Sequence, residues 1–104
     1  MALQIKTLAE LNLTSAGTAQ ALSATSILAQ VVYINAKTTN AGNIYIGDSN
    51  VASNRYLVLL DAGESVSIEA SEFGTSGDLD LSEIYFDGGT TNDDIYVGYI
   101  QRQN

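Results

Sequence analysis

Apolar and polar residues alternate along the chain in short segments, and each segment is followed by a turn rich in Gly, Asn, Asp or Ser. This period of two is typical of β-strands. The longest such segment, residues 27–37, carries apolar residues on both faces, which predicts a central strand that could be covered on both sides. One face holds Val32, Ile34 and Ala36, and the other holds Val31 and Tyr33.

Two pairs of strands are joined by so few residues that we expect hairpins. The first would join residues 27–37 to residues 44–46 through a turn that contains a glycine. The second would join residues 56–60 to residues 65–69, with Gly63 suited to a positive φ. Short loops of this composition between alternating strands are typical of hairpin turns.

The remaining strands are expected near both ends of the chain. Residues 84–86 form a short one, and in residues 95–100 the side chains of Ile95, Val97 and Tyr99 share a face. Residues 3–5 and 18–22 carry weaker strand patterns, and residues 6–13 could instead form a short helical turn. About seven to eight short antiparallel strands predict an all-β fold, a single β-sandwich that is jelly-roll-like or, as the alternative, immunoglobulin-like.

With 104 residues the chain is long enough for one domain, residues 1–104, and not for two. Residues 1–14 are a possible N-terminal arm, because they are apolar, weakly patterned and precede the clear strands. An ordinary first strand is the alternative. As an arm, this segment would contact a partner through four apolar side chains: Leu3, Ile5, Leu8 and Leu11.

Composition removes most kinds of active site. There is no cysteine and no histidine, so disulfides, the usual zinc sites and histidine-based catalysis are excluded. The net charge is −8, and the four basic residues are scattered, which argues against binding to nucleic acid or to an anionic membrane. We therefore expect no catalytic residues, no metal and no cofactor.

No apolar run approaches the ~20 residues that span a bilayer. The N-terminus also lacks the pattern of a signal peptide. The expected site of synthesis is a cytoplasm.

Two acidic segments are candidate calcium sites. Asp78, Asp80 and Glu83 lie within six residues, but leucines occupy the alternate positions, which favours a loop that leads into a strand. Asp93 and Asp94 precede the last strand, where adjacent acids more often prevent unwanted pairing at a sheet edge.

Two further groups of side chains could serve either a structural or a functional role. A glycosidase dyad of Asp48 with Glu69 or Glu72 would require a cleft, which nothing in the sequence predicts. Expected strands contain Tyr33, Tyr45, Tyr85, Tyr96 and Tyr99, so cross-strand packing is favoured over a binding surface.

Three segments together carry a resemblance to a family. They are residues 40–53, NAGNIYIGDSNVAS, then residues 61–70, DAGESVSIEA, and then residues 80–100, DLSEIYFDGGTTNDDIYVGYI. In this order they resemble small structural proteins of tailed-bacteriophage virions, of the β-sandwich capsid decoration or cement type. Residues 36–100 match in order, the first 35 match loosely, and Ala62 stands where proline is common in the family.

The resemblance implies a virion component without catalytic activity. Such proteins lie on the outer capsid surface as decoration, or occur in neck, tail or head-fibre parts, and often form trimers. The chain would then be made in the cytoplasm of the bacterial host and would bind capsid or other virion proteins. Further contacts are expected from the loop at Asp48, Ser49 and Asn50. A receptor- or carbohydrate-binding module and a calcium-dependent β module are the alternatives.

Overall fold

Eleven strands and one short 3₁₀ helix make up the described part of the computed structural model, which covers residues 2–70 and 77–102. Four of the strands are only two residues long. In chain order the elements are β1 (Leu3–Thr7), β2 (Leu11–Asn12), β3 (Gln20–Ala21), β4 (Leu28–Ala29), β5 (Val31–Ala36), β6 (Ile44–Gly47), β7 (Val58–Leu60), β8 (Ser65–Glu69), β9 (Leu79–Asp80), η2 (Leu81–Glu83), β10 (Tyr85–Gly88) and β11 (Asp94–Arg102).

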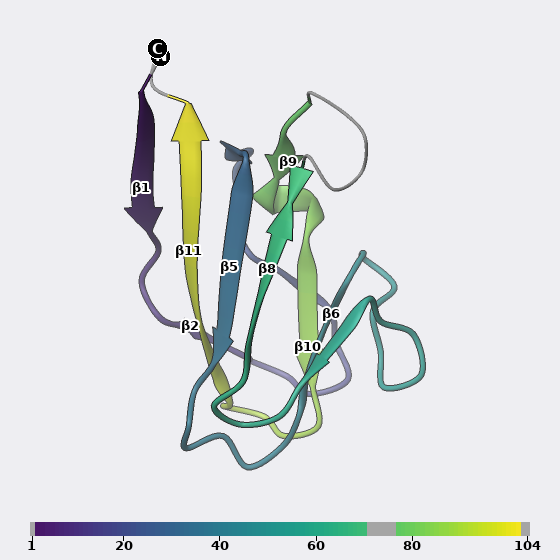
Figure 1. Ribbon diagram of the computed structural model, residues 1–104. Coiled ribbons are helices and arrows are strands. Elements are labelled where there is room, and N and C mark those ends of the chain that lie inside the picture. The colour runs from purple at the N-terminus through teal and green to yellow at the C-terminus, as the bar shows by residue number, and fades with distance from the viewer. Residues whose placement is uncertain (1, 71–76, 103–104) are drawn as a thin grey trace.

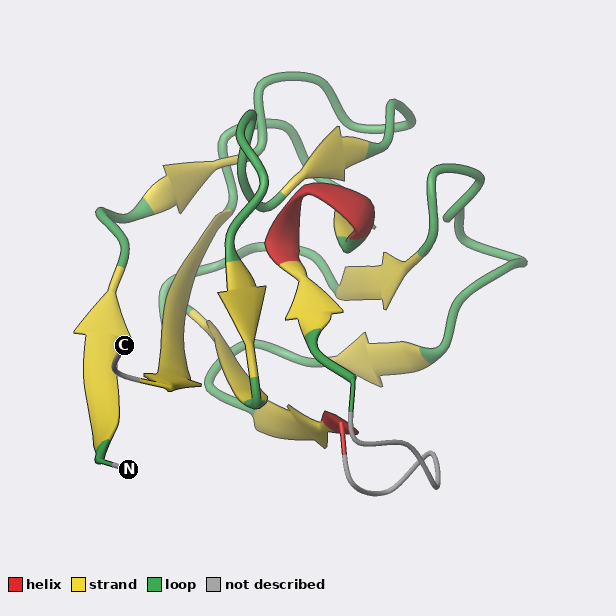
Figure 2. Cartoon of the chain, turned by 90° about the horizontal axis from the view of Figure 1, so that it is seen from above, coloured by secondary structure: helices red, strands yellow, loops and turns green. Residues whose placement is uncertain are grey.

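The strands form two antiparallel sheets that pack as a sandwich (Figures 1 and 2). The first sheet has the order β1-β11-β5-β8, and β2 extends its β1 edge by pairing with the other end of β11. The second has the order β3-β10-β6-β7. A third, two-stranded pairing joins β4 and β9. The expected all-β sandwich is confirmed.

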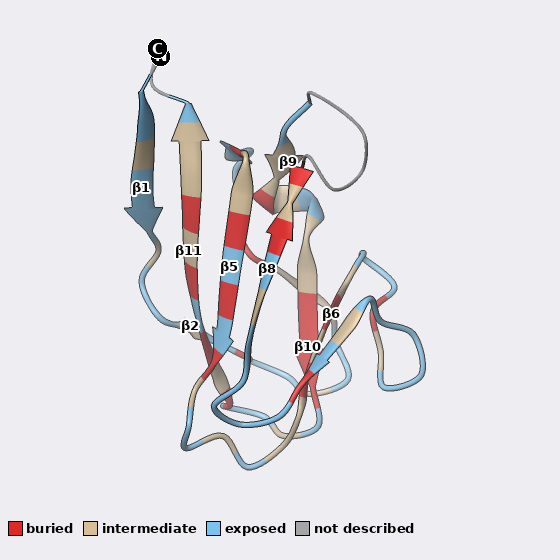
Figure 3. Ribbon diagram, viewed as in Figure 1, coloured by how far each residue is buried: buried red, intermediate tan, exposed pale blue. Residues whose placement is uncertain are grey.

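The core fills the space between the two sheets. Along β5 and β11, buried residues alternate with more exposed ones, as the banding in Figure 3 shows. The inward residues are those that the alternation predicts, because a period of two places every second side chain on the same face. Fully buried side chains from the two sheets include Val32, Ile34, Ile95, Ile44, Ile46 and Phe86.

None of the described residues covers the outer face of the first sheet, so the expectation that β5 is covered on both sides is wrong. On this face Tyr33 remains 42% exposed and Val31 is half-buried. β5 is central only within its sheet, between β11 and β8. Its second apolar face is therefore a surface of the molecule.

Both expected hairpins are wrong for the same reason. β5 pairs with β11 and β8, whereas β6 pairs with β10 and β7, so the connection between β5 and β6 crosses from one sheet to the other. The connection between β7 and β8 also crosses, in the reverse direction. Gly63 has the expected positive φ, 83°. The turn residues reverse the chain, but they do not determine which strand becomes the partner.

The N-terminal segment belongs to the first sheet. β1 pairs along the last five residues of β11, and β2 pairs with its first two. Leu8 and Leu11 pack against the core, and Leu13 is fully buried. The described part of residues 1–14 is therefore strand and connecting chain, and the helical turn considered for residues 6–13 is absent.

Asp93 is buried and holds two loops together. It is 6% exposed, and its two carboxylate oxygens accept hydrogen bonds from the backbone amides of Ala41, at 2.9 Å, and Gly42, at 2.8 Å. The expectation that this acid prevents edge pairing is wrong, because β11 lies inside the sheet, between β1 and β5. Asp93 instead fixes the β5–β6 connection against the β10–β11 connection.

We predict that Asp93→Ala lowers the free energy of unfolding by about 2 to 3 kcal/mol, because it leaves two backbone amides without their acceptor. Urea denaturation followed by circular dichroism measures the change. Asp61→Ala, which removes an exposed carboxylate in another turn, should change stability by less than about 0.5 kcal/mol. Equal effects in the two variants would contradict the structural role of Asp93.

Candidate interaction surfaces

The carboxylate of Asp80 is occupied by hydrogen bonds within the chain. One oxygen accepts from the Ser26 hydroxyl at 2.7 Å, and the other accepts from the Ser82 amide at 2.9 Å and its hydroxyl at 2.8 Å. The second oxygen also accepts from the amide of Ile27. These bonds, with the Ser26 hydroxyl contributing most, lower the pKa of Asp80 to about 2. Asp80 thus caps η2 and joins it to the residues before β4.

Two other acidic residues of the expected calcium sites contact different side chains. Asp78 contacts Gln30 and Arg102, and Asp94 accepts a hydrogen bond from the side-chain amide of Asn12 at 2.8 Å. Within residues 2–70 and 77–102 no three acidic side chains come close enough to hold a metal ion. The carboxylates act as acceptors for the chain itself. Glu72, proposed with Asp48 and Glu69 as a dyad, lies outside the described residues.

Glu10 organises an exposed cluster beside the β2 end of the first sheet. Its carboxylate lies 3.1 Å from the ammonium group of Lys37 and accepts a hydrogen bond of 2.9 Å from the Tyr96 hydroxyl. The hydrogen bond and the charge of Glu10 raise the pKa of Lys37, and the hydrogen bond raises that of Tyr96. Because the cluster is exposed, its contribution to stability is small.

Four apolar residues of the N-terminal segment are expected to contact a partner, and two of them are exposed enough to do so. Leu3 and Ile5 on β1 are 61% and 81% exposed. Leu8 and Leu11 are half-buried and pack against the core. The structure thus divides the four apolar residues of the expected arm into two that are exposed and two that pack against the core.

The loop between β6 and β7 contains the other expected contact residues. Asp48, Ser49 and Asn50 are all exposed. Asp48 accepts a hydrogen bond of 3.0 Å from the amide of Asn50, and its carbonyl accepts from the amide of Val51. These bonds make a tight turn, so the loop presents its side chains from a defined backbone.

Two neighbouring apolar residues that sequence reasoning placed inside a strand are exposed. Tyr56 and Leu57 precede β7 and are 46% and 63% exposed. The ring of Tyr56 stacks on that of Tyr45, with centroids 5.7 Å apart. The sequence YLVLL at residues 56–60 indicates that some of these side chains are exposed. Successive side chains of a strand point to opposite faces, so five consecutive apolar residues cannot all face the core.

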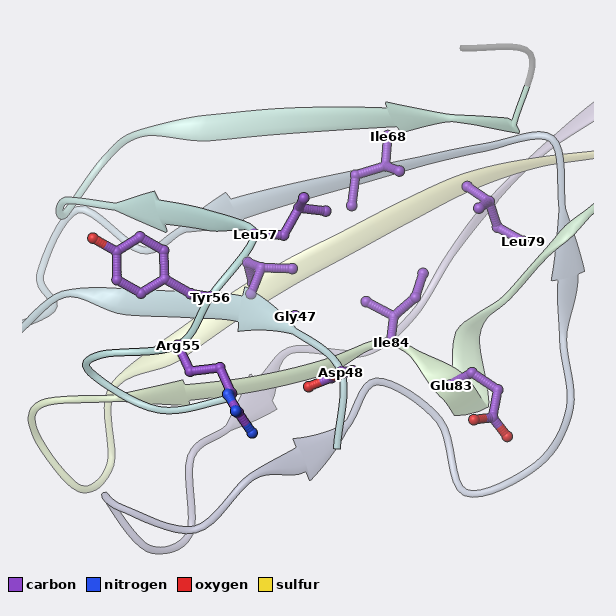
Figure 4. A pocket seen from close by; sticks show the side chains of 10 residues that line it. Gly47, Asp48, Arg55, Tyr56, Leu57, Ile68, Leu79, Glu83 and Ile84 are labelled. Atoms are coloured by element: carbon purple, nitrogen blue, oxygen red, sulfur yellow. The ribbon is translucent and has the colours of Figure 1, made fainter. Parts of the chain in front are cut away.

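Tyr56 and Leu57 border a groove with a volume of about 470 Å³. In Figure 4 the apolar side chains of Leu57, Ile68, Leu79 and Ile84 gather on one side of it, and the charged ones lie along the other. The groove lies beside the edge strands β7 and β8, since Leu57 directly precedes β7 and Ile68 lies on β8. Its charged residues are Asp48, Arg55 and Glu83.

The β6–β7 loop and the β1 edge lie on opposite sides of the molecule (Figure 1). Among the described residues, Tyr56 and Leu57 on one side and Leu3 and Ile5 on the other therefore belong to separate exposed apolar surfaces. We call the first the groove surface (residues 48–57 with the groove) and the second the β1 edge (residues 3–7).

Comparison with protein-family models, curated proteins and solved structures gives no match. Among the described residues, no helix is long and apolar enough to cross a membrane.

We predict that Asp80 makes the protein less stable in acid. Its folded-state pKa of about 2 lies below the ordinary 3.8, so its hydrogen bonds stabilise the fold above about pH 4 and are lost as the pH falls toward 2. In Asp80→Asn this part of the pH dependence should be absent. Thermal melts between pH 6 and 2 measure it, with Asp61→Asn as control; parallel curves for wild type and Asp80→Asn would contradict the assignment.

Proposed function

We propose that this chain is a non-enzymatic structural protein of a bacteriophage virion, and within the virion a capsid decoration protein. It would bind the outer capsid surface through the groove surface and stabilise the shell. The resemblance of residues 40–53, 61–70 and 80–100 to such proteins supports the proposal, and so does the all-β sandwich.

The proposal rests mainly on one contrast: the acidic groups already have hydrogen-bond partners within the chain, whereas several apolar side chains are exposed. Asp80 and Asp93 have their oxygens bound by the chain's own donors. Tyr56 and Leu57, in contrast, stand exposed beside an apolar groove. A surface that places exposed apolar side chains beside charged ones is typical of a protein-binding site.

The mechanism would be clamping of the assembled shell. A protein that binds only the closed arrangement of capsid subunits stabilises that arrangement by mass action. The net charge of −8 supports a place on the outside of the particle, because an acidic protein would be repelled by packaged DNA. Neck, tail or head-fibre positions are the alternatives within the virion.

A carbohydrate- or receptor-binding module is the second candidate, and one observation favours it. The stacked rings of Tyr45 and Tyr56 lie next to the polar loop at residues 48–50, and a half-exposed aromatic ring offers a sugar an apolar face. A Tyr56→Ala variant that loses binding on a glycan array would support this function. An array without signal, together with intact capsid binding, would exclude it.

Leu57→Ser should weaken binding to capsids stripped of this protein by at least about tenfold, as expected for loss of a central apolar anchor. Sedimentation of the protein with stripped capsids measures it, and heat resistance of the refilled capsids should fall in parallel. Leu57 is 63% exposed, so the variant should fold.

Leu28→Ser is the matched control, since Leu28 is 50% exposed on β4, outside the groove, and its replacement should leave capsid binding unchanged. Wild-type protein that fails to bind stripped capsids would refute the decoration role. Its detection in purified tails alone would then assign it to the tail.

A further inference from the structure

β1 forms one edge of the first sheet, and among the described residues it pairs only with β11. Its pairing runs without a break over five residues, from Leu3 opposite Arg102 to Thr7 opposite Gly98. Most proteins protect such an edge with a proline, a bulge, a covering loop or charged side chains, because its free backbone groups can pair with another strand. Here the described residues show no bulge or cover, the chain has no proline, and Lys6 is the one charged residue of β1.

The direction of the backbone groups on β1 follows from one hydrogen bond. The amide of Leu8 donates to the carbonyl of Val97 at 3.0 Å, and this pair continues the register of β1 and β11. In an antiparallel pair, alternate residues turn their N–H and C=O toward the partner. Lys6 and Gln4 therefore bond to β11, whereas Leu3, Ile5 and Thr7 turn both backbone groups to the free edge.

We propose that the β1 edge binds the β1 edge of a second copy of this chain, antiparallel and around a two-fold axis at Ile5. In this register Ile5 lies opposite Ile5 of the second copy, and Leu3 lies opposite Thr7. All three residues with outward-facing backbone groups then meet each other, and each opposed pair can exchange both of its hydrogen bonds. The two sheets would join into one continuous sheet across the pair.

The side chains favour the same register. Ile5 is 81% exposed and lies beside Ile100, which lies beside Val31, so the outer face of the sheet carries an apolar row that ends at the free edge. Pairing around Ile5 joins the two rows and removes its side chain from water. On the other face, Lys6 lies opposite Gln4 of the second copy, whose amide oxygen can accept a hydrogen bond from the ammonium group.

Charge and side-chain character favour a second copy at the β1 edge over the β8 edge of the same sheet. Two chains of net charge −8 repel each other, but β1 has no acidic residue, contains Lys6 and pairs with Arg102 of β11. The other edge of the sheet, β8, presents Ser65, Ser67 and Glu69 to the outer face, which offers Ile5 no apolar partner. The β1 edge is thus complementary to itself.

Single cysteine variants test the register, because the chain has no other cysteine. Ile5→Cys should form a disulfide-linked dimer on mild oxidation, since opposed residues lie about 5.5 Å apart between Cα atoms. Leu3→Cys alone should not, because the two Leu3 positions lie about 13 Å apart along the paired strands. A mixture of Leu3→Cys and Thr7→Cys should cross-link at least about tenfold faster than either variant alone.

Sedimentation equilibrium tests the pairing without cross-links. Wild type should dimerise reversibly, and Ile5→Lys should weaken dimerisation at least about tenfold through a like-charge pair, while Ile5→Val should not. Circular dichroism checks that the variants fold, which the exposure of Ile5 predicts. A wild type that stays monomeric up to about 1 mM, a trimer that Ile5→Lys leaves intact, or equal cross-linking of all variants would overturn the proposal. The test is independent of capsid binding.

Discussion

The structure depends on burying one apolar layer between two sheets. A chain of this size has a small core, and without cysteines it has no disulfide to support it. β5 and β11 supply the centre of one inner face, while β6 and β10 supply the other. Because consecutive strands lie in opposite sheets at four connections (β2–β3, β5–β6, β7–β8 and β10–β11), the core closes only when residues far apart in the sequence meet.

Buried carboxylates hold these connections in place. Asp93 binds the amides of the β5–β6 connection, and Asp87, 2% exposed in β10, accepts hydrogen bonds from the amides of Gly17 and Gly88, both at 2.8 Å. A buried carboxylate without hydrogen-bond partners would destabilise the fold. Each carboxylate oxygen that accepts a backbone hydrogen bond therefore also holds in place the loop that supplies the donor. Of the acidic residues that suggest metal binding in the sequence, Asp80 and Asp93 bind backbone amides in this way.

The alternation of apolar residues predicts most strands and their inward faces, as in 27–37 and 95–100, because burial imposes a period of two. It does not predict pairing: the turn at Gly63 looks like a hairpin turn whether the next strand joins the same sheet or the opposite one. The sequence could indicate that Ile5 is exposed, but it could not indicate that Leu8 packs against the core instead. The groove requires residues from β6, the β6–β7 loop, β8, β9 and η2, which only the fold brings together.

The central claim is that this sandwich is a scaffold whose exposed apolar surfaces bind proteins of a virion. The β1 edge and the groove surface lie on opposite sides, so one can pair copies while the other faces the shell (Figure 1). Electron cryomicroscopy of the particle that carries this chain tests the claim most directly. We expect density for the sandwich on the outer capsid surface, with residues 48–57 against the shell. Density confined to another part of the particle, or a sandwich bound with residues 48–57 facing solvent, would contradict it.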